Sequence, residues 1–254
     1  AQAGDRSPAA KLGLLDATMV GMGAMIGAGI FVLTGLAADI AGPAALLVFA
    51  LNGVVTAFTG VSYAELASAI PKSGGGYVFV REVFSGPTSF LMGWMLAFAY
   101  MIAGALYALG FSSNFVEFVH LYWAGLPTGP VWHIVYALVV VGLFALLNAV
   151  STEASGGAET VVTIIKIIIL LIFAGFGAFA VEGGNFEPFF AGDRASVSLL
   201  QAMGLTFIAF EGYDLIATVT EEVENPRENI PKAIFISLVA TVAIYLLVVW
   251  VAIG

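Results

Sequence analysis

The stretch "GMGAMIGAGIF", residues 21 to 31, places four glycines within nine positions of an otherwise apolar run. Each glycine in a helix interior costs about 1 kcal/mol relative to alanine. Two explanations are open from this stretch alone. Small residues four apart let neighbouring helices approach closely. Gly27 and Gly29 lie only two apart, which instead favours a segment that leaves helical geometry and offers its N–H groups to an anion.

The composition around this stretch is that of a membrane protein. Of the 254 residues, 61% are hydrophobic and 10% are charged, and apolar stretches long enough to span a bilayer recur along the chain. We predict seven membrane-spanning segments, at residues 17–38, 43–69, 88–116, 131–150, 160–181, 198–219 and 233–254. Four prolines at or just before a predicted start support these boundaries, because a first helical turn needs no N–H there: Pro43, Pro87, Pro130 and Pro231.

The basic residues predict the orientation. With the N-terminus in the cytoplasm, six of the eight basic residues fall inside, Arg194 falls outside and Lys166 lies within a span. We therefore expect a multi-pass protein of the cytoplasmic membrane with its N-terminus inside. Residues 1–16 then form a cytoplasmic tail and residues 182–197 an extracellular loop. The charged stretch 72–86 is too short to span and predicts a short interfacial helix.

Several classes of protein do not fit this sequence. The absence of cysteine excludes disulfides and thiolate metal sites, and a net charge of −9 without a basic patch argues against nucleic acid as a partner. No H-E-x-x-H, G-x-S-x-G or P-loop pattern occurs, so we expect no enzyme activity, no metal and no cofactor. The last predicted span lacks the lysine that a retinal protein needs, and a receptor would begin outside.

A second anomaly lies in the sixth predicted span, where Glu211, Gly212 and Asp214 interrupt apolar sequence. Either the span ends near residue 210, or it continues past an internal break, which the return to apolar residues at 213–220 favours. At an offset of 185 residues, Gly27 aligns with Gly212. Because the first span runs outward and the sixth inward, two interrupted helices in inverted halves predict a substrate site at the midplane. We expect Gly27 to Gly29 to leave helical geometry there.

Lys166 is the only basic residue within a predicted span. A lysine near a helix end often extends toward the membrane interface. The alternative is an ammonium group that faces the bundle interior, where burial favours its neutral form and suits it to carry a proton or to replace a coupling cation. The sequence leaves both open.

Three stretches together resemble the amino acid–polyamine–organocation (APC) family of transporters, and especially its proton-coupled and cationic amino acid members. They are "IGAGIF", "YAELASAIPKSGGGYVFVREVF" and "FIAFEGYDLIATVTEEVENPRENIPKAI". The resemblance implies an all-α integral membrane fold of two inverted five-helix repeats in which helices one and six are broken. Residues 17–181 would form the first repeat and residues 198–254 the first two helices of the second. The remaining helices of the transporter, the lipid bilayer and an amino acid substrate would be its partners.

The resemblance also implies a site. The N–H groups of Gly27, Ala28 and Gly29 would bind the substrate carboxylate, and carbonyls around Met25 and Ile26 would bind its ammonium group. The sixth helix would contribute carbonyls near Ile208 and Phe210 and an aromatic cover, either Phe207 or Phe210, in a segment that also includes Ala209 and Gly212. Lys166 would couple transport to protons, with Glu211 and Asp214 as further candidates. The implied function is proton-coupled transport of amino acids by alternating access, with an exchanger or facilitator of the same fold, or a sensor that does not transport, as alternatives.

Overall fold

The protein is known from a computed structural model, which describes residues 11–123, 125, 127–150, 155–190 and 195–254. The described part is all-α apart from one isolated parallel bridge between Leu12 and Val223. The α-helices are α1 (Leu14–Met25), α2 (Ala28–Ala41), α3 (Ala45–Ala69), α4 (Gly75–Val83), α5 (Gly86–His120), α6 (Pro130–Val150), α7 (Ser155–Gly177), α8 (Ala195–Thr206) and α9 (Pro226–Ile253). The 3₁₀ helices are η1 (Gly42–Ala44), η2 (Gly183–Phe186), η3 (Phe207–Phe210) and η4 (Tyr213–Glu222).

The predicted spans correspond to these helices, with boundaries that differ by a few residues. The first predicted span comprises α1 and α2, and the sixth comprises α8, η3 and η4. Five helical runs in the described part are long and apolar enough to cross a membrane, and α1 and the described part of α6 are shorter apolar helices. The all-α membrane fold is therefore confirmed, as is a short helix, α4, within the charged stretch 72–86.

One predicted boundary is wrong. The last helix begins at Pro226 rather than at residue 233, so Pro231 lies inside α9 instead of before it. Pro226 occupies the first turn, where a missing N–H has no intrahelical acceptor to lose. Pro231 follows in the second turn.

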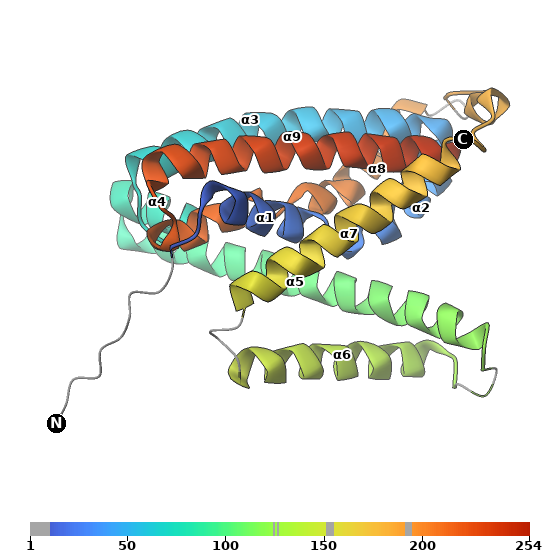
Figure 1. Cartoon of the computed structure of the whole chain (residues 1–254), viewed down its shortest axis with the longest axis horizontal. Coiled ribbons are helices and arrows are strands. Elements are labelled where there is room, and N and C mark those ends of the chain that lie inside the picture. The colour runs from blue at the N-terminus through green and yellow to red at the C-terminus, as the bar shows by residue number, and fades with distance from the viewer. Residues whose placement is uncertain (1–10, 124, 126, 151–154, 191–194) are drawn as a thin grey trace.

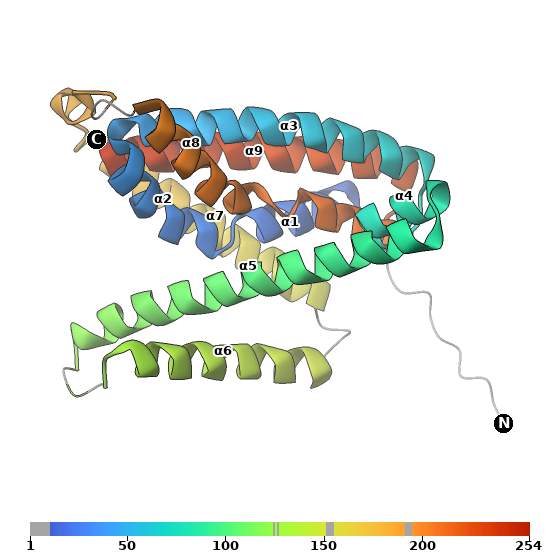
Figure 2. The ribbon, with the colours of Figure 1, turned by 180° about the vertical axis from the view of Figure 1, so that it is seen from behind.

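The helices pair in an antiparallel arrangement that inverted repeats predict. Figure 1 shows α3 and α9 side by side, with their chain directions opposed. Each half of one interrupted helix packs against a half of the other: α1 packs against η4, and α2 packs against α8. Figure 2 shows α5 and α6 together along one side of this group. The first and sixth predicted spans thus lie together, with their interruptions at the same level.

Two apolar cores meet at that level. One core joins α2, α3, α8 and α9, and it includes Ile26, Phe49, Phe210 and Tyr245. The other joins α1, α3, η4 and α9, and it includes Met25. Met25, the last residue of α1, and Ile26, the first residue of the interruption, therefore belong to different cores, so the interruption lies between the two.

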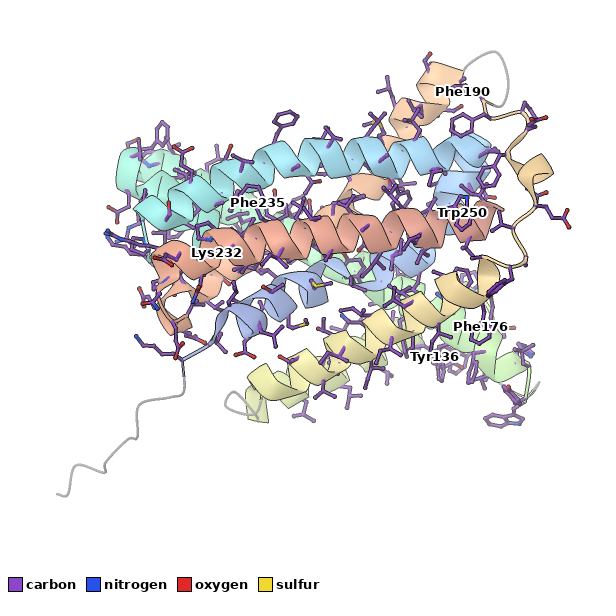
Figure 3. All side chains as sticks on the ribbon, turned by 45° about the horizontal axis from the view of Figure 1, so that its top comes forward. Tyr136, Phe176, Phe190, Lys232, Phe235 and Trp250 are labelled. Atoms are coloured by element: carbon purple, nitrogen blue, oxygen red, sulfur yellow. The ribbon has the colours of Figure 1, made fainter. Side chains whose placement is uncertain are left out.

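Hydrogen bonds join the chain segments at the end of the bundle that carries α4. Glu221 of η4 exchanges hydrogen bonds with Ser73: its N–H donates to Ser73 Oγ at 3.0 Å, and the Ser73 N–H donates to its carboxylate at 3.4 Å. Leu12 pairs with the backbone of Glu222 and Glu224 at 2.8 and 2.9 Å. Figure 3 labels Lys232 at this end of α9 and Trp250 at the opposite end. The first pair of bonds ties η4 to the segment before α4, and the second ties η4 to the segment before α1.

Candidate functional site

The first interruption is a two-residue break between α1 and α2. Ile26 (φ −75°, ψ 61°) and Gly27 (φ −91°, ψ −159°) are non-helical, and α2 begins at Ala28. The expectation that Gly27 to Gly29 leave helical geometry is therefore wrong for Ala28 and Gly29, which are the first two helical residues of α2. The Gly27 N–H donates to Met25 O at 2.7 Å. The N–H groups without an intrahelical acceptor are those of the first turn of α2, and no side chain caps them in the described part.

The glycines of this stretch serve two purposes. A Cβ on Gly21 would lie 2.9 Å from Ser237 Oγ, and one on Gly29 would lie 2.9 Å from Ala209 Cβ. A Cβ on Gly21 would also clash with Ile216 of η4, so Gly21 permits close packing against η4 and α9, and Gly29 permits it against η3. A Cβ on Gly27 would meet only ordinary contacts, the nearest at 3.5 Å. Packing explains Gly21 and Gly29, whereas the break explains Gly27.

The second interruption lies between η3 and η4. Glu211 is extended and Gly212 has φ 129°, after which a helical segment resumes at Tyr213. The sixth span is thus broken internally and does not end near residue 210. A Cβ on Gly212 would lie 2.7 Å from Met25 N and 2.8 Å from Ala24 C. The backbones of the two breaks are therefore in direct contact, and only glycine fits between them.

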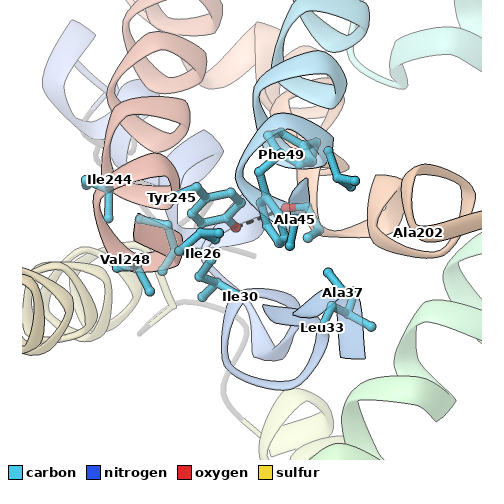
Figure 4. Packing of buried hydrophobic residues seen from close by; sticks show 14 of the residues in the cluster. Ile26, Ile30, Leu33, Ala37, Ala45, Phe49, Ala202, Ile244, Tyr245 and Val248 are labelled. Atoms are coloured by element: carbon cyan, nitrogen blue, oxygen red, sulfur yellow. Dashed lines mark hydrogen bonds between the residues drawn. The ribbon is translucent and has the colours of Figure 1, made fainter. Parts of the chain in front are cut away.

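Tyr245 of α9 connects both breaks. Its hydroxyl lies 2.5 Å from Met25 O and 3.0 Å from Ala209 O, so its single proton is shared between carbonyls of the two interrupted helices. Figure 4 shows the Tyr245 ring beside Phe49 in the core. The side chain is fully buried, and its ring packs edge-on against Phe49 and Phe210. Sequence reasoning missed this residue. A phenol in the apolar run "AIYLLVV" was the available signal, because a buried hydroxyl needs a partner.

The aromatic candidates of the sixth helix differ in direction. The Phe210 side chain is 1% exposed and lies between Phe49 and Tyr245, with ring centroids 5.7 and 5.3 Å away. It therefore faces the core. Phe207 is partly exposed and is the one whose ring remains accessible. Ala209 is also buried, so it contributes only its backbone, while Ile208 is partly exposed.

Tyrosines of α5 line the accessible side of the breaks. The Tyr107 ring lies 3.5 Å from where a Cβ of Gly27 would be, and its hydroxyl is 3.4 Å from Ile208 O, a long contact. Tyr107 is also close enough to the Glu211 carboxylate to interact with it electrostatically. Asp214 accepts hydrogen bonds from the Tyr100 hydroxyl at 2.5 Å and from the Gly212 N–H at 3.1 Å. The structure thus brings Glu211 and Asp214 to the second break, beside α5.

Lys166 lies on the other side of the first interrupted helix. Its ammonium group donates to Gly23 O of α1 at 2.8 Å, and α7 packs along α1. The side chain is directed inward, onto the turn of α1 before the break, rather than toward a helix end.

Asn52 of α3 is a further polar residue that sequence reasoning missed. Its amide donates to Thr206 Oγ1 at 2.9 Å and to Met203 O at 3.1 Å. Both acceptors belong to the last turns of α8 before the second break. The side chain is 2% exposed, so these bonds hold the broken helix in place from within the core.

Two broken helices in contact, inside an all-α membrane bundle, agree with the match to known proteins. The family described as amino acid permease matches residues 12–254. The chain belongs to this family. The expected membership in the APC transporters is thereby confirmed, and the protein is a multi-pass membrane protein.

Three relatives illustrate the match. The branched-chain amino acid permease BcaP of Bacillus subtilis is 32% identical over 98% of this chain and 55% of its own length. The methylthioribose transporter of the same organism is 32% identical over 100% of this chain and 57% of its own length. Cationic amino acid transporter 4 of Mus musculus is 33% identical over 93% of this chain and 39% of its own length. The chain spans about half the length of the curated relatives it matches.

Proposed function

We propose that this chain is part of a secondary active transporter that moves amino acids across the cytoplasmic membrane with a proton as coupling ion, its N-terminus inside. The observation that carries the proposal is the direct contact of the two breaks at Gly212 and Met25, supported by the family membership. In the proposed transporter the chain supplies the first five-helix repeat and two helices of the second. The remaining helices complete the site.

The breaks suit the two ends of an amino acid. The first turn of α2 offers the N–H groups of Ala28 and Gly29 and the positive end of a helix dipole, which favours a carboxylate. The ends of α1 and η3 offer carbonyls at Ile26 and Ile208 for an ammonium group, whereas Met25 O already accepts from the Gly27 N–H and the Tyr245 hydroxyl. Phe207 is the accessible aromatic side chain that would cover the substrate.

The position of Lys166 supports proton coupling. While protonated, its ammonium group donates to Gly23 O and links α7 to the half-helix before the break. A neutral amine is a much weaker donor, so loss of the proton would loosen this link and let α1 move relative to α7. Glu211 and Asp214 are further candidate proton carriers beside the second break.

The arrangement of the half-helices supports alternating access. The pair α1 and η4 lies on one side of the breaks, and the pair α2 and α8 lies on the other. Movement of either pair would open the site to one side of the membrane while the other pair keeps it closed.

The test is uptake by the full-length transporter in proteoliposomes, at two pH values, with and without sodium. A one-unit pH gradient drives at most about tenfold accumulation in a 1:1 symport. We expect sodium-independent accumulation that rises with the gradient, and Lys166→Ala should abolish this pH dependence. Lys232→Ala is the matched control, because Lys232 is exposed and, within the described residues, pairs with Glu228 on its own helix.

Other outcomes identify the alternatives. Uptake that requires an internal amino acid and ignores the pH gradient would identify an exchanger. Saturable binding without any uptake would identify a sensor. If Lys166→Ala keeps the pH dependence of the wild type, Lys166 is not the coupling residue.

A further inference from the structure

Glu211 is a carboxylate at the centre of the second break. Its backbone is fixed, because its N–H donates to Ile208 O at 3.3 Å and the next residue, Gly212, is wedged against Ala24 and Met25. The side chain is partly buried within a membrane-spanning segment. Within the described part of the chain, its carboxylate has no hydrogen bond and no ion pair. A charge placed there is costly unless something pairs with it.

Asp214, a second carboxylate at the same break, does have hydrogen-bond donors. It accepts bonds from the Tyr100 hydroxyl and the Gly212 N–H, which tie it to α5 and to its own turn. Glu211 has neither partner. The two carboxylates are close enough to repel each other, so Asp214 increases the demand for a positive charge at Glu211.

The other groups within electrostatic range of Glu211 are also rich in oxygen. Tyr100 and Tyr107 of α5 and Tyr213 of η4 lie within range of its charge. Tyr107 leans over Gly27 toward Ile208 O, so this surface adjoins the break that we propose for substrate binding. Lys166 is the basic residue among the described residues of the spans, and its ammonium group donates a hydrogen bond to Gly23 O of α1 and not to Glu211. A carboxylate, phenol oxygens and a main-chain carbonyl together favour a cation.

We propose that Glu211 binds the positively charged side chain of a cationic amino acid, so that the site prefers substrates with a second amino group or a guanidinium group. This inference rests on the proposed function and names the substrate class of the same site. The backbone groups of the breaks hold the carboxylate and the α-ammonium group, and the substrate side chain extends toward Tyr107 and Glu211. An apolar side chain at that place leaves Glu211 unpaired.

Lysine and norleucine make a matched pair of substrates, because they differ only in the terminal ammonium group. In proteoliposomes that contain the full-length transporter, we expect kcat/KM for lysine to exceed that for norleucine by at least about tenfold. Glu211→Gln should lower this ratio by at least about tenfold, whereas Glu211→Asp should keep a preference for lysine. The control is Glu117→Gln, an exposed carboxylate on the last turn of α5, which should leave the ratio unchanged.

Three results would overturn the inference. The first is a wild-type transporter that takes up norleucine as well as lysine. The second is a Glu211→Gln variant that keeps the wild-type ratio. The third is a Glu211→Gln variant whose uptake stays measurable but falls by the same factor for both substrates, since this would place Glu211 at the α-ammonium group common to both.

A variant without uptake is tested by binding. Lysine and norleucine are added to the purified full-length protein, and the shift of its thermal unfolding temperature is measured. Stabilisation of Glu211→Gln by norleucine but not by lysine supports the inference, and equal stabilisation by both overturns it. If the wild type neither transports nor binds lysine or norleucine but accumulates another amino acid, the inference fails and the proposed function stands. If it accumulates no amino acid, both fail.

Discussion

Replacing Gly212 by alanine should separate the two breaks. A Cβ at this position would lie 2.7 Å from Met25 N and 2.8 Å from Ala24 C, which are backbone atoms and not the ends of flexible side chains. Real Cβ atoms essentially never approach so closely. The backbone of one interrupted helix must therefore move away from the other.

The cost has two parts. Gly212 has φ 129°, a conformation that costs an L-residue about 1–3 kcal/mol. Forcing a methyl group into a packed interior costs about 1–3 kcal/mol more. The sum is about 2–6 kcal/mol, and the lower limit already changes the folding equilibrium about 30-fold.

Thermal unfolding of the full-length protein in detergent measures this loss, with Gly35→Ala as the control. Gly35 also lies in the first interrupted helix, but a Cβ there meets nothing within 4 Å in the described part. Alanine at Gly35 should be neutral or stabilise by about 0.5–1 kcal/mol. If Gly212→Ala is as stable as Gly35→Ala and transports normally, the breaks are not held in contact as described.

Three further changes probe the surroundings. Tyr245→Phe removes the donor shared by Met25 O and Ala209 O, while the ring stays packed, and should lower the free energy of unfolding by about 1–3 kcal/mol. Thermal unfolding measures this loss. An unchanged unfolding temperature would show that the hydroxyl does not hold the breaks together. Asn52→Leu removes the donor to α8 and should cost a similar amount, about 1–3 kcal/mol, by the same measurement; a more stable variant would contradict this. The hydrogen bond and charge of Lys72 hold the pKa of Glu82 below its ordinary value, so this pair stabilises at neutral pH and the effect is lost as the pH falls through the lowered pKa. NMR titration should show a higher Glu82 pKa in Lys72→Ala, and no change would refute the pairing.

The helices and the locations of both breaks were predictable because they depend on local sequence. Apolar length predicts each span, and glycine or carboxylate residues within a span mark an interruption. The offset that aligned Gly27 with Gly212 paired residues with the same role, since each is the N-cap of the second half of a broken helix. The equivalence of Gly27 and Gly212 in the two broken helices could therefore be predicted from the sequence alone.

The sequence could not divide roles among neighbours. Gly27 and Gly29 look alike in the chain, yet Gly27 is the N-cap of α2, whereas Gly29 accommodates Ala209, a partner 180 residues away. Phe207 and Phe210 differ only in the direction of their side chains, and that direction follows from the packing of Phe49 and Tyr245. Tyr245 itself was not predicted because its role arises from two carbonyls that only the fold brings together.

The most direct test of the central claim is an experimental structure of the full-length transporter with a bound amino acid. We predict the substrate carboxylate within hydrogen-bond distance of the N–H groups of Ala28 and Gly29, and the ammonium group against the carbonyls at the ends of α1 and η3. An amino acid bound away from both breaks, while Gly27 and Gly212 keep the geometry described, would contradict it.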